Sequence, residues 1–155
     1  MKLRTLFLTL LLLPGLAVAG QQKPTLGKQE PSLQGPRSAS ITDARKLAGV
    51  RALYVERIDN SLSERLVEGL AKSGRFRVVA ERREADAVLR GTCAEYRRLK
   101  TVRTEVYLND KGGASIWQDN VRRSYNPPTL DKAVTETAEI ILAHLVESFL
   151  EAGSK

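Results

Sequence analysis

The chain has 155 residues, of which 42% are hydrophobic and 28% are charged, and its formal net charge is +7. This length favours a single domain. The only cysteine, Cys93, excludes an intramolecular disulfide, so core burial must stabilise the fold.

The N-terminal residues have the three-part pattern of a secretory signal peptide. Lys2 and Arg4 precede an apolar run over residues 5–13, which a Pro-Gly pair ends. Small residues at 17–19 then provide a cleavage site. The run is too short to span a bilayer as a helix, which needs about 20 apolar residues. We therefore predict a signal peptide over residues 1–19 and a periplasmic protein, with association to the outer membrane left open; an uncleaved anchor is the alternative.

The residues after the cleavage site predict a linker. A lipoprotein signal would place a cysteine where Gly20 and Gln21 stand, so no lipid anchor is expected. Residues 20–42 are rich in Pro, Gly, Gln and Ser and have no hydrophobic period, which is typical of a flexible linker. A single α+β domain is expected over residues 43–153.

Strand and helix signals alternate through this domain. In chain order they predict a strand over 50–58, a helix over 61–73, strands over 75–80, 87–100, 101–108 and 114–125, and a long helix over 130–152. The first strand, helix and strand form a βαβ unit, whose strands should be parallel. The order β-α-β-β-β-β-α predicts an α+β two-layer sandwich. Its mixed four- to five-stranded sheet carries two helices on one face and leaves the other at least partly open.

Both helices have end signals and an apolar stripe. Ser61 and Glu64 have the spacing of a capping box, and Gly74 fits a left-handed C-terminal stop. Gly69 weakens the helix interior by about 1 kcal/mol and suggests close packing against a strand. Thr129 should cap the second helix. Its stripe, expected to cover the sheet, consists of Leu130, Val134, Ala138, Ile141, Leu145 and Phe149.

The candidate catalytic residues are few. His144 is the only histidine, and one histidine with one cysteine does not make a zinc site, which needs three or four ligands. We interpret Cys93 as a buried core residue and His144 as a surface residue; a Cys93–His144 nucleophile–base pair is the minor alternative. We therefore expect no enzyme activity, metal or cofactor.

Basic residues gather on the predicted strands between 87 and 125. Arginine on an open sheet face can hold phosphate groups through paired hydrogen bonds. The candidate ligand-binding residues, for an anionic lipid, are Arg90, Arg97, Arg98 and Arg103. The alternative is a solvated face with cross-strand arginine–glutamate pairs through Glu95 and Glu105. Nucleic acid is not expected as a partner of an exported protein.

Two sequence segments carry a resemblance to a known family. The strings GRFRVV at 74–79 and ADAVLRG at 85–91, followed by Ile116-Trp117 and the long last helix, resemble the LptE family of lipopolysaccharide-assembly proteins. Similar strings occur in the N-terminal domain of TolB and in CsgG-like and LpoB-like periplasmic proteins, all of which have a helix-backed sheet.

The LptE resemblance implies a non-catalytic envelope component that plugs the outer-membrane β-barrel for lipopolysaccharide insertion. The basic strand residues would then meet lipid A phosphates. The alternative implied by the other families is a periplasmic module that binds another envelope protein. LptE proteins are lipid-anchored at an N-terminal cysteine, and this chain departs from that pattern.

Overall fold

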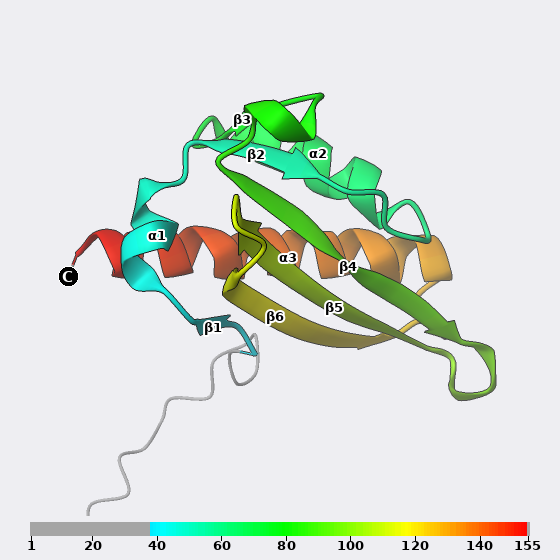
Figure 1. Cartoon of the computed structure of the whole chain (residues 1–155). Helices are drawn as coiled ribbons and strands as arrows, with labels where there is room; N and C mark the ends of the chain where they lie inside the picture. The colour runs from blue at the N-terminus through cyan, green and yellow to red at the C-terminus, as the bar shows by residue number, and fades with distance from the viewer. Residues whose placement is uncertain (1–37, 155) are drawn as a thin grey trace, which may run out of the picture. The chain divides into compact units, whose positions relative to one another are not determined.

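The structure, a computed structural model, describes residues 38–154. The predicted signal peptide and most of the predicted linker lie outside these residues. The elements are β1 (Ser40–Ile41), α1 (Ala44–Gly49), β2 (Ala52–Val55), α2 (Leu62–Ser73), β3 (Arg77–Val78), the 3₁₀ turn η1 (Arg82–Glu84), β4 (Ala87–Tyr96), the 3₁₀ turn η2 (Arg97–Leu99), β5 (Thr101–Asp110), β6 (Ser115–Ser124) and α3 (Leu130–Gly153) (Figure 1).

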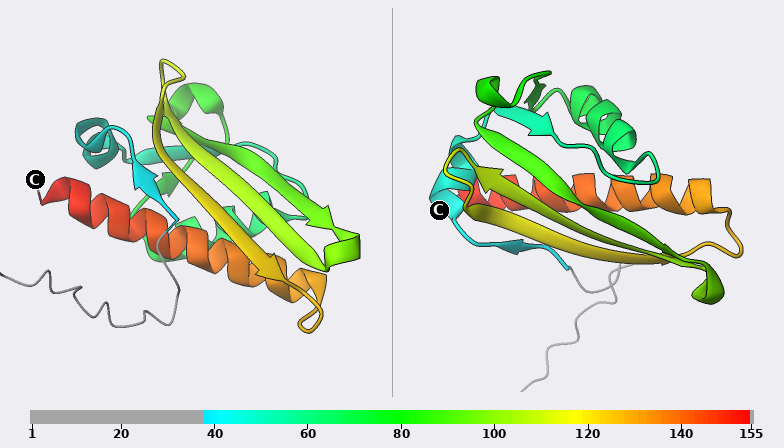
Figure 2. Two further views of the ribbon diagram at one scale, coloured as in Figure 1. Left: turned by 90° about the horizontal axis from the view of Figure 1, so that it is seen from below. Right: turned by 45° about the vertical axis from the view of Figure 1, so that its right-hand side comes forward.

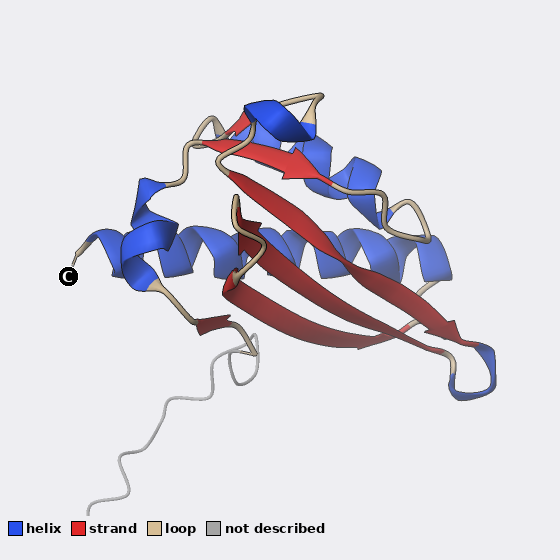
Figure 3. Ribbon diagram, viewed as in Figure 1, coloured by secondary structure: helices blue, strands red, loops and turns tan. Residues whose placement is uncertain are grey.

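The strands form one mixed sheet in the order β1-β6-β5-β4-β2-β3. β2 runs parallel to β3 and β4, while β4, β5, β6 and β1 pair antiparallel. The two long helices, α2 and α3, lie on one side of the sheet (Figures 2 and 3). This confirms the predicted α+β sandwich with parallel βαβ strands, and the sheet has six strands where four to five were predicted.

The additional strand is β1, at the end of the segment assigned to the linker. Ser40 pairs with Gln118 and Ile41 with Trp117, and the Thr42 N–H donates to the Ile116 carbonyl. Two residues are too few to show a periodicity of two, so the sequence carries no signal for this strand.

The predicted capping box at the start of α2 is wrong. An N-cap residue needs an extended backbone, but Ser61 has a φ of 57° and its side chain makes no cap hydrogen bond. The Ser63 hydroxyl instead donates to the Ile58 carbonyl. The end signals at Gly74, with a φ of 61°, and at Thr129, whose hydroxyl accepts from the Lys132 N–H, are confirmed.

The core lies between the sheet and the two long helices. Alternate residues of β4, β5 and β6 face the helix side of the sheet, and the predicted α3 stripe from Val134 to Phe149 is buried in the same core. Trp117 is the largest fully buried side chain, and its indole N–H donates to the Ser148 hydroxyl of α3 at 2.9 Å. No helix within residues 38–154 is long and apolar enough to span a bilayer.

Gly69 lies at the contact of α2 with α3. A Cβ atom at this position would lie 2.1 Å from Leu142 Cδ1 of α3. The close neighbour of Gly69 is therefore a helix, where the sequence suggested a strand. The missing side chain lets the two helices approach while both cover the same face of the sheet.

We predict that Leu145→Ala lowers the free energy of unfolding by about 2–5 kcal/mol, because Leu145 is fully buried in the α3 stripe. Urea unfolding of the purified chain measures this change. Leu150→Ala on the same helix is the control, since Leu150 is 56% exposed, and should change stability by less than about 0.5 kcal/mol. Equal losses in the two variants would contradict the packing of α3.

Candidate anion-binding surface

On the side of the sheet opposite the helices, the three neighbouring strands β4, β5 and β6 each carry an exposed arginine. Because side chains alternate along a strand, Arg90 of β4, Arg103 of β5 and Arg122 of β6 point away from α3. All three are exposed. We call these three residues the basic face.

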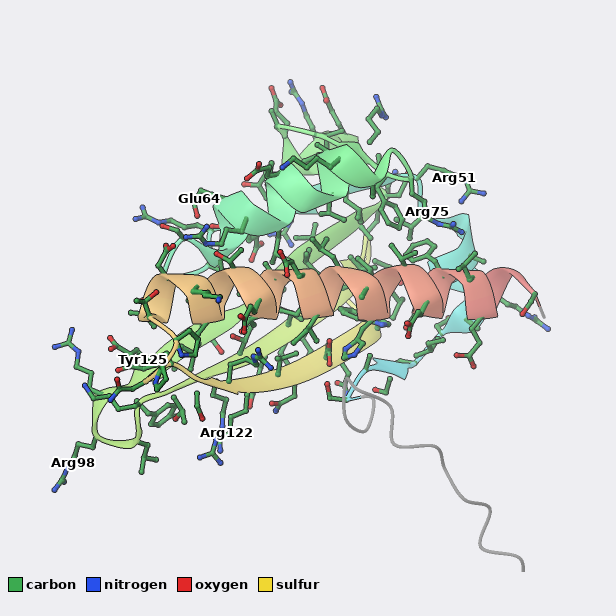
Figure 4. All side chains as sticks on the ribbon, turned by 180° about the vertical axis from the view of Figure 1, so that it is seen from behind. Arg51, Glu64, Arg75, Arg98, Arg122 and Tyr125 are labelled. Carbon is green, nitrogen blue, oxygen red and sulfur yellow. The ribbon has the colours of Figure 1, made fainter. Side chains whose placement is uncertain are left out.

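The strand register places Arg103 directly opposite Arg122. Like charges in this position repel each other and destabilise a strand pair. The Arg103 guanidinium lies 5.7 Å from the centre of the Tyr96 ring, but among residues 38–154 neither arginine forms an ion pair. Figure 4 shows Arg122 extending into solvent. The pair therefore forms a position whose positive charge no ion pair among the described residues offsets.

The predicted alternative, cross-strand arginine–glutamate pairs, does not neutralise this position. The Glu105 carboxylate accepts from Asn120 Nδ2 at 3.3 Å and from the Tyr107 hydroxyl at 3.5 Å. Arg90 has a distant ion pair, 4.0 Å from Glu56. The basic face is thus least compensated at Arg103 and Arg122.

The structure separates the four predicted ligand-binding residues. Arg90 and Arg103 belong to the basic face, whereas Arg97 and Arg98 lie in η2, the turn that joins β4 to β5. The strand predicted over 87–100 ends at Tyr96, four residues early. Arg122 was not among the predicted residues, because its place opposite Arg103 depends on the register of the β5–β6 pairing, which the sequence does not reveal.

The turn between β4 and β5 is attached to the end of β6. Lys100 has a φ of 49°, and its carbonyl accepts from the Tyr125 N–H at 2.9 Å. The Tyr125 hydroxyl donates to Glu95 at 2.7 Å, and Arg97 Nε donates to the same carboxylate at 3.2 Å. These hydrogen bonds, that of Tyr125 first, lower the pKa of the Glu95 carboxyl, and the Glu95 bond raises the pKa of the Tyr125 phenol.

The Glu95 carboxyl should therefore titrate below its ordinary value. Tyr125→Phe and Arg97→Gln should each raise this titration midpoint, because each removes a hydrogen bond to the carboxylate, and NMR of the Glu95 side-chain carboxyl measures it. Because the folded pKa is the lower one, the stabilising contribution is present above the unfolded value of about 4.3 and is lost as pH falls through the folded pKa. A midpoint unchanged in Tyr125→Phe would contradict this hydrogen bond.

His144 is buried, so its prediction as a surface residue is wrong. Its Nδ1 lies 2.7 Å from Oδ2 of Asp119, a buried residue of β6, and Asp119 Oδ1 accepts from the Ser38 hydroxyl. The sequence does not reveal which residue of another element pairs with a single polar residue beside an apolar stripe. Asp119 reaches His144 only because α3 packs on β6.

Cys93 is buried in β4, as predicted, and its sulfur accepts from the Thr104 hydroxyl at 3.5 Å. No hydrogen bond joins Cys93 to His144 in the part of the chain that the structure describes. The same part contains no group of three or more histidine, cysteine or acidic residues arranged to hold a metal ion.

We predict that Asp119→Ala lowers the free energy of unfolding by about 1–3 kcal/mol, because it leaves the buried His144 without its partner. A double-mutant cycle with His144→Leu, measured by urea unfolding, should give a coupling of about 0.5–3 kcal/mol. Strictly additive effects would show that the pair contributes nothing beyond its two residues.

Comparisons with known proteins identify the fold of this chain but do not assign it to a family. No family model matches the sequence, and no curated protein matches it. Among solved structures, the chain is similar to a PelC dodecamer from Paraburkholderia phytofirmans, a single-substitution variant, with a TM-score of 0.52 and 19% identity over 71% of this chain and 97% of that one. It is also similar to TolB from Acinetobacter baumannii, with a TM-score of 0.51 and 10% identity over 73% of this chain and 31% of that one.

These similarities define the class of the protein as an α+β domain with the fold of PelC and of a part of TolB. The predicted resemblance to TolB is confirmed at the level of the fold. The resemblance to the LptE family stays a prediction. At these low identities the likeness describes the fold alone.

Proposed function

We propose that this protein is a non-catalytic, exported component of the bacterial cell envelope that binds an anionic partner through its basic face. The observation that carries this proposal is the opposition of Arg103 and Arg122 on neighbouring strands, with no ion pair to either among residues 38–154. The signal-peptide pattern over residues 1–19 supports export.

An anion with several oxygens is the ligand that suits this position. Two guanidinium groups on one side of a sheet can each donate paired hydrogen bonds to a phosphate, which also removes the repulsion between them. The exposed rings of Tyr96 and Tyr107 lie on the same side of the sheet. They supply apolar surface beside the charged groups, which fits an amphiphilic ligand better than a free ion.

The finer proposal is a role of the LptE type in lipopolysaccharide assembly at the outer membrane. In this role the basic face would meet the phosphates of lipid A, and the domain would bind a β-barrel. The resemblance at residues 74–79 and 85–91 supports this role. The ability of the two arginines to bind phosphate supports lipid A as the ligand. The proposal of a β-barrel partner rests on the sequence resemblance alone.

The second candidate is a module that binds protein, either another envelope protein or further copies of itself. The similar PelC structure, nearly all of which this chain covers, is a dodecamer. Native mass spectrometry separates the candidates, because an oligomer of one defined size in the absence of lipid favours self-assembly. Recovery of a β-barrel with the chain from envelope extracts favours the LptE type.

We predict that Arg122→Gln weakens binding to lipopolysaccharide by about tenfold, the equivalent of one lost charge-assisted hydrogen bond. Its stability should stay the same or rise by up to about 1 kcal/mol, because the repulsion with Arg103 disappears. Isothermal titration calorimetry and urea unfolding measure the two quantities.

Arg83→Gln is the matched control, since Arg83 is exposed in η1 and lies outside the basic face. It removes the same charge and should leave lipopolysaccharide affinity within about twofold if long-range charge is screened. Equal losses in the two variants, or no binding by the unaltered chain, would overturn the proposed site.

A further inference from the structure

The turn between β4 and β5 presents apolar side chains to solvent at the end of the sheet. We call residues 96–100 the tip. Leu99 is 64% exposed and Tyr96 is 44% exposed. Figures 1 and 2 show the tip projecting from the end of the long β4–β5 hairpin. Leu99 does not belong to the buried core, and its exposed surface together with that of Tyr96 is available for contact with another molecule.

The tip is held in one conformation without any contribution from the Leu99 side chain. The Lys100 N–H donates to the Arg97 carbonyl at 3.3 Å, and the Lys100 carbonyl accepts from the Tyr125 N–H. The Glu95–Tyr125 hydrogen bond fixes the base of the turn. Because these bonds form before any partner binds, little conformational entropy remains to be lost when Leu99 makes a contact.

Positive charge surrounds this apolar side chain. Arg97, Arg98 and Lys100 are exposed and flank Leu99 in sequence. The nearest acid in the sequence, Glu95, is already engaged by Tyr125 and Arg97. Figure 4 shows Arg98 extending into solvent, and Arg98 forms no ion pair among residues 38–154. The uncompensated charge of the tip is therefore positive.

An exposed apolar side chain, an aromatic ring and several basic groups together match the interface of an anionic bilayer. Tyrosine is favoured at the level of the lipid headgroups, and each basic residue near an anionic surface contributes about 1 kcal/mol of attraction. A protein groove would have to supply both an apolar pocket and several carboxylates in fixed positions, whereas a fluid anionic surface supplies both without fixed geometry.

We propose that the tip docks the domain on an anionic lipid bilayer, with Leu99 inserted among the acyl chains and Arg98 and Lys100 at the phosphates. This inference rests on the proposed function, because both need an anionic lipid partner. It deepens that function by separating two contacts: the tip holds the bilayer, and the basic face holds individual headgroups. Arg103, whose guanidinium lies 5.7 Å from the centre of the Tyr96 ring, connects the two.

Site-specific fluorescence tests the insertion. An environment-sensitive dye is attached to the Leu99→Cys variant of the full chain. Its emission maximum should shift to the blue when vesicles of phosphatidylcholine with phosphatidylglycerol are added, and a lipid-borne quencher should reduce its emission. Vesicles of phosphatidylcholine alone should give neither change. The unaltered chain controls for labelling of Cys93, which is buried.

Leu150→Cys is the matched control for an exposed leucine. Leu150 is 56% exposed near the end of α3, roughly 30 Å along the helix from its first residue. The tip lies near the start of α3, since Tyr125 bonds to Lys100. A dye at position 150 should therefore show no shift and no quenching on the same vesicles.

Vesicle sedimentation supplies the energetic test. Leu99→Ser should weaken partitioning to anionic vesicles by about tenfold, from the loss of one buried aliphatic side chain. Arg98→Gln should weaken it by about fivefold, and both the unaltered chain and Leu99→Ser should lose affinity as salt rises. Leu150→Ser should partition like the unaltered chain.

Each other outcome overturns the inference in a distinguishable way. Binding to anionic vesicles without a change in the emission of the dye at position 99 would rule out insertion of the tip and would leave the proposed function intact. A blue shift that depends on protein concentration without vesicles would show that the tip contacts a second copy. The chain could fail to bind anionic vesicles while Arg122→Gln still weakens its binding to lipopolysaccharide. This result would show that the protein binds single headgroups and does not dock on a bilayer. Failure of both assays would reject both proposals.

Discussion

The packing of α3 along one face of the sheet is the interaction on which the rest of the structure depends. With α2 it buries alternate residues of the sheet, and the buried pairs Trp117–Ser148 and Asp119–His144 fix β6 to α3. Once α2 and α3 occupy this face, the alternation of strands sends Arg90, Arg103 and Arg122 to the opposite one. The basic face is thus a direct consequence of where the helices lie.

Local patterns in the sequence were sufficient for the architecture. The α3 stripe, the alternation in β5 and the stop at Gly74 each follow from a period or a single residue type, and the structure has all three. The failures have a common cause, because each depends on contacts across the chain. β1 is too short to have a period, and Ser61 is turned into a left-handed conformation that its sequence neighbours do not reveal.

The sequence predicted which arginines are candidates for binding, but it did not predict how they are arranged in space. Arg90, Arg97, Arg98 and Arg103 are exposed, as a binding role requires, but the end of β4 at Tyr96 divides them between sheet and tip. The neighbour of Arg103 is Arg122, and that pairing is a property of the β5–β6 register. Basic residues in a sequence predict an attraction to anions. The register between two strands determines which two of these side chains lie close enough to bind the same anion.

The short strand β1 has a mechanical consequence. It holds the first described residues to the domain through two paired positions on β6, aided by the hydrogen bond from Ser38 to Asp119. Tension applied at residue 38 would meet these few bonds and the partly buried Ile41 before it reached the fully buried side chains of the core. The edge of the sheet would peel first, and the domain would gain several residues of reach while the sheet and helices behind it stayed folded.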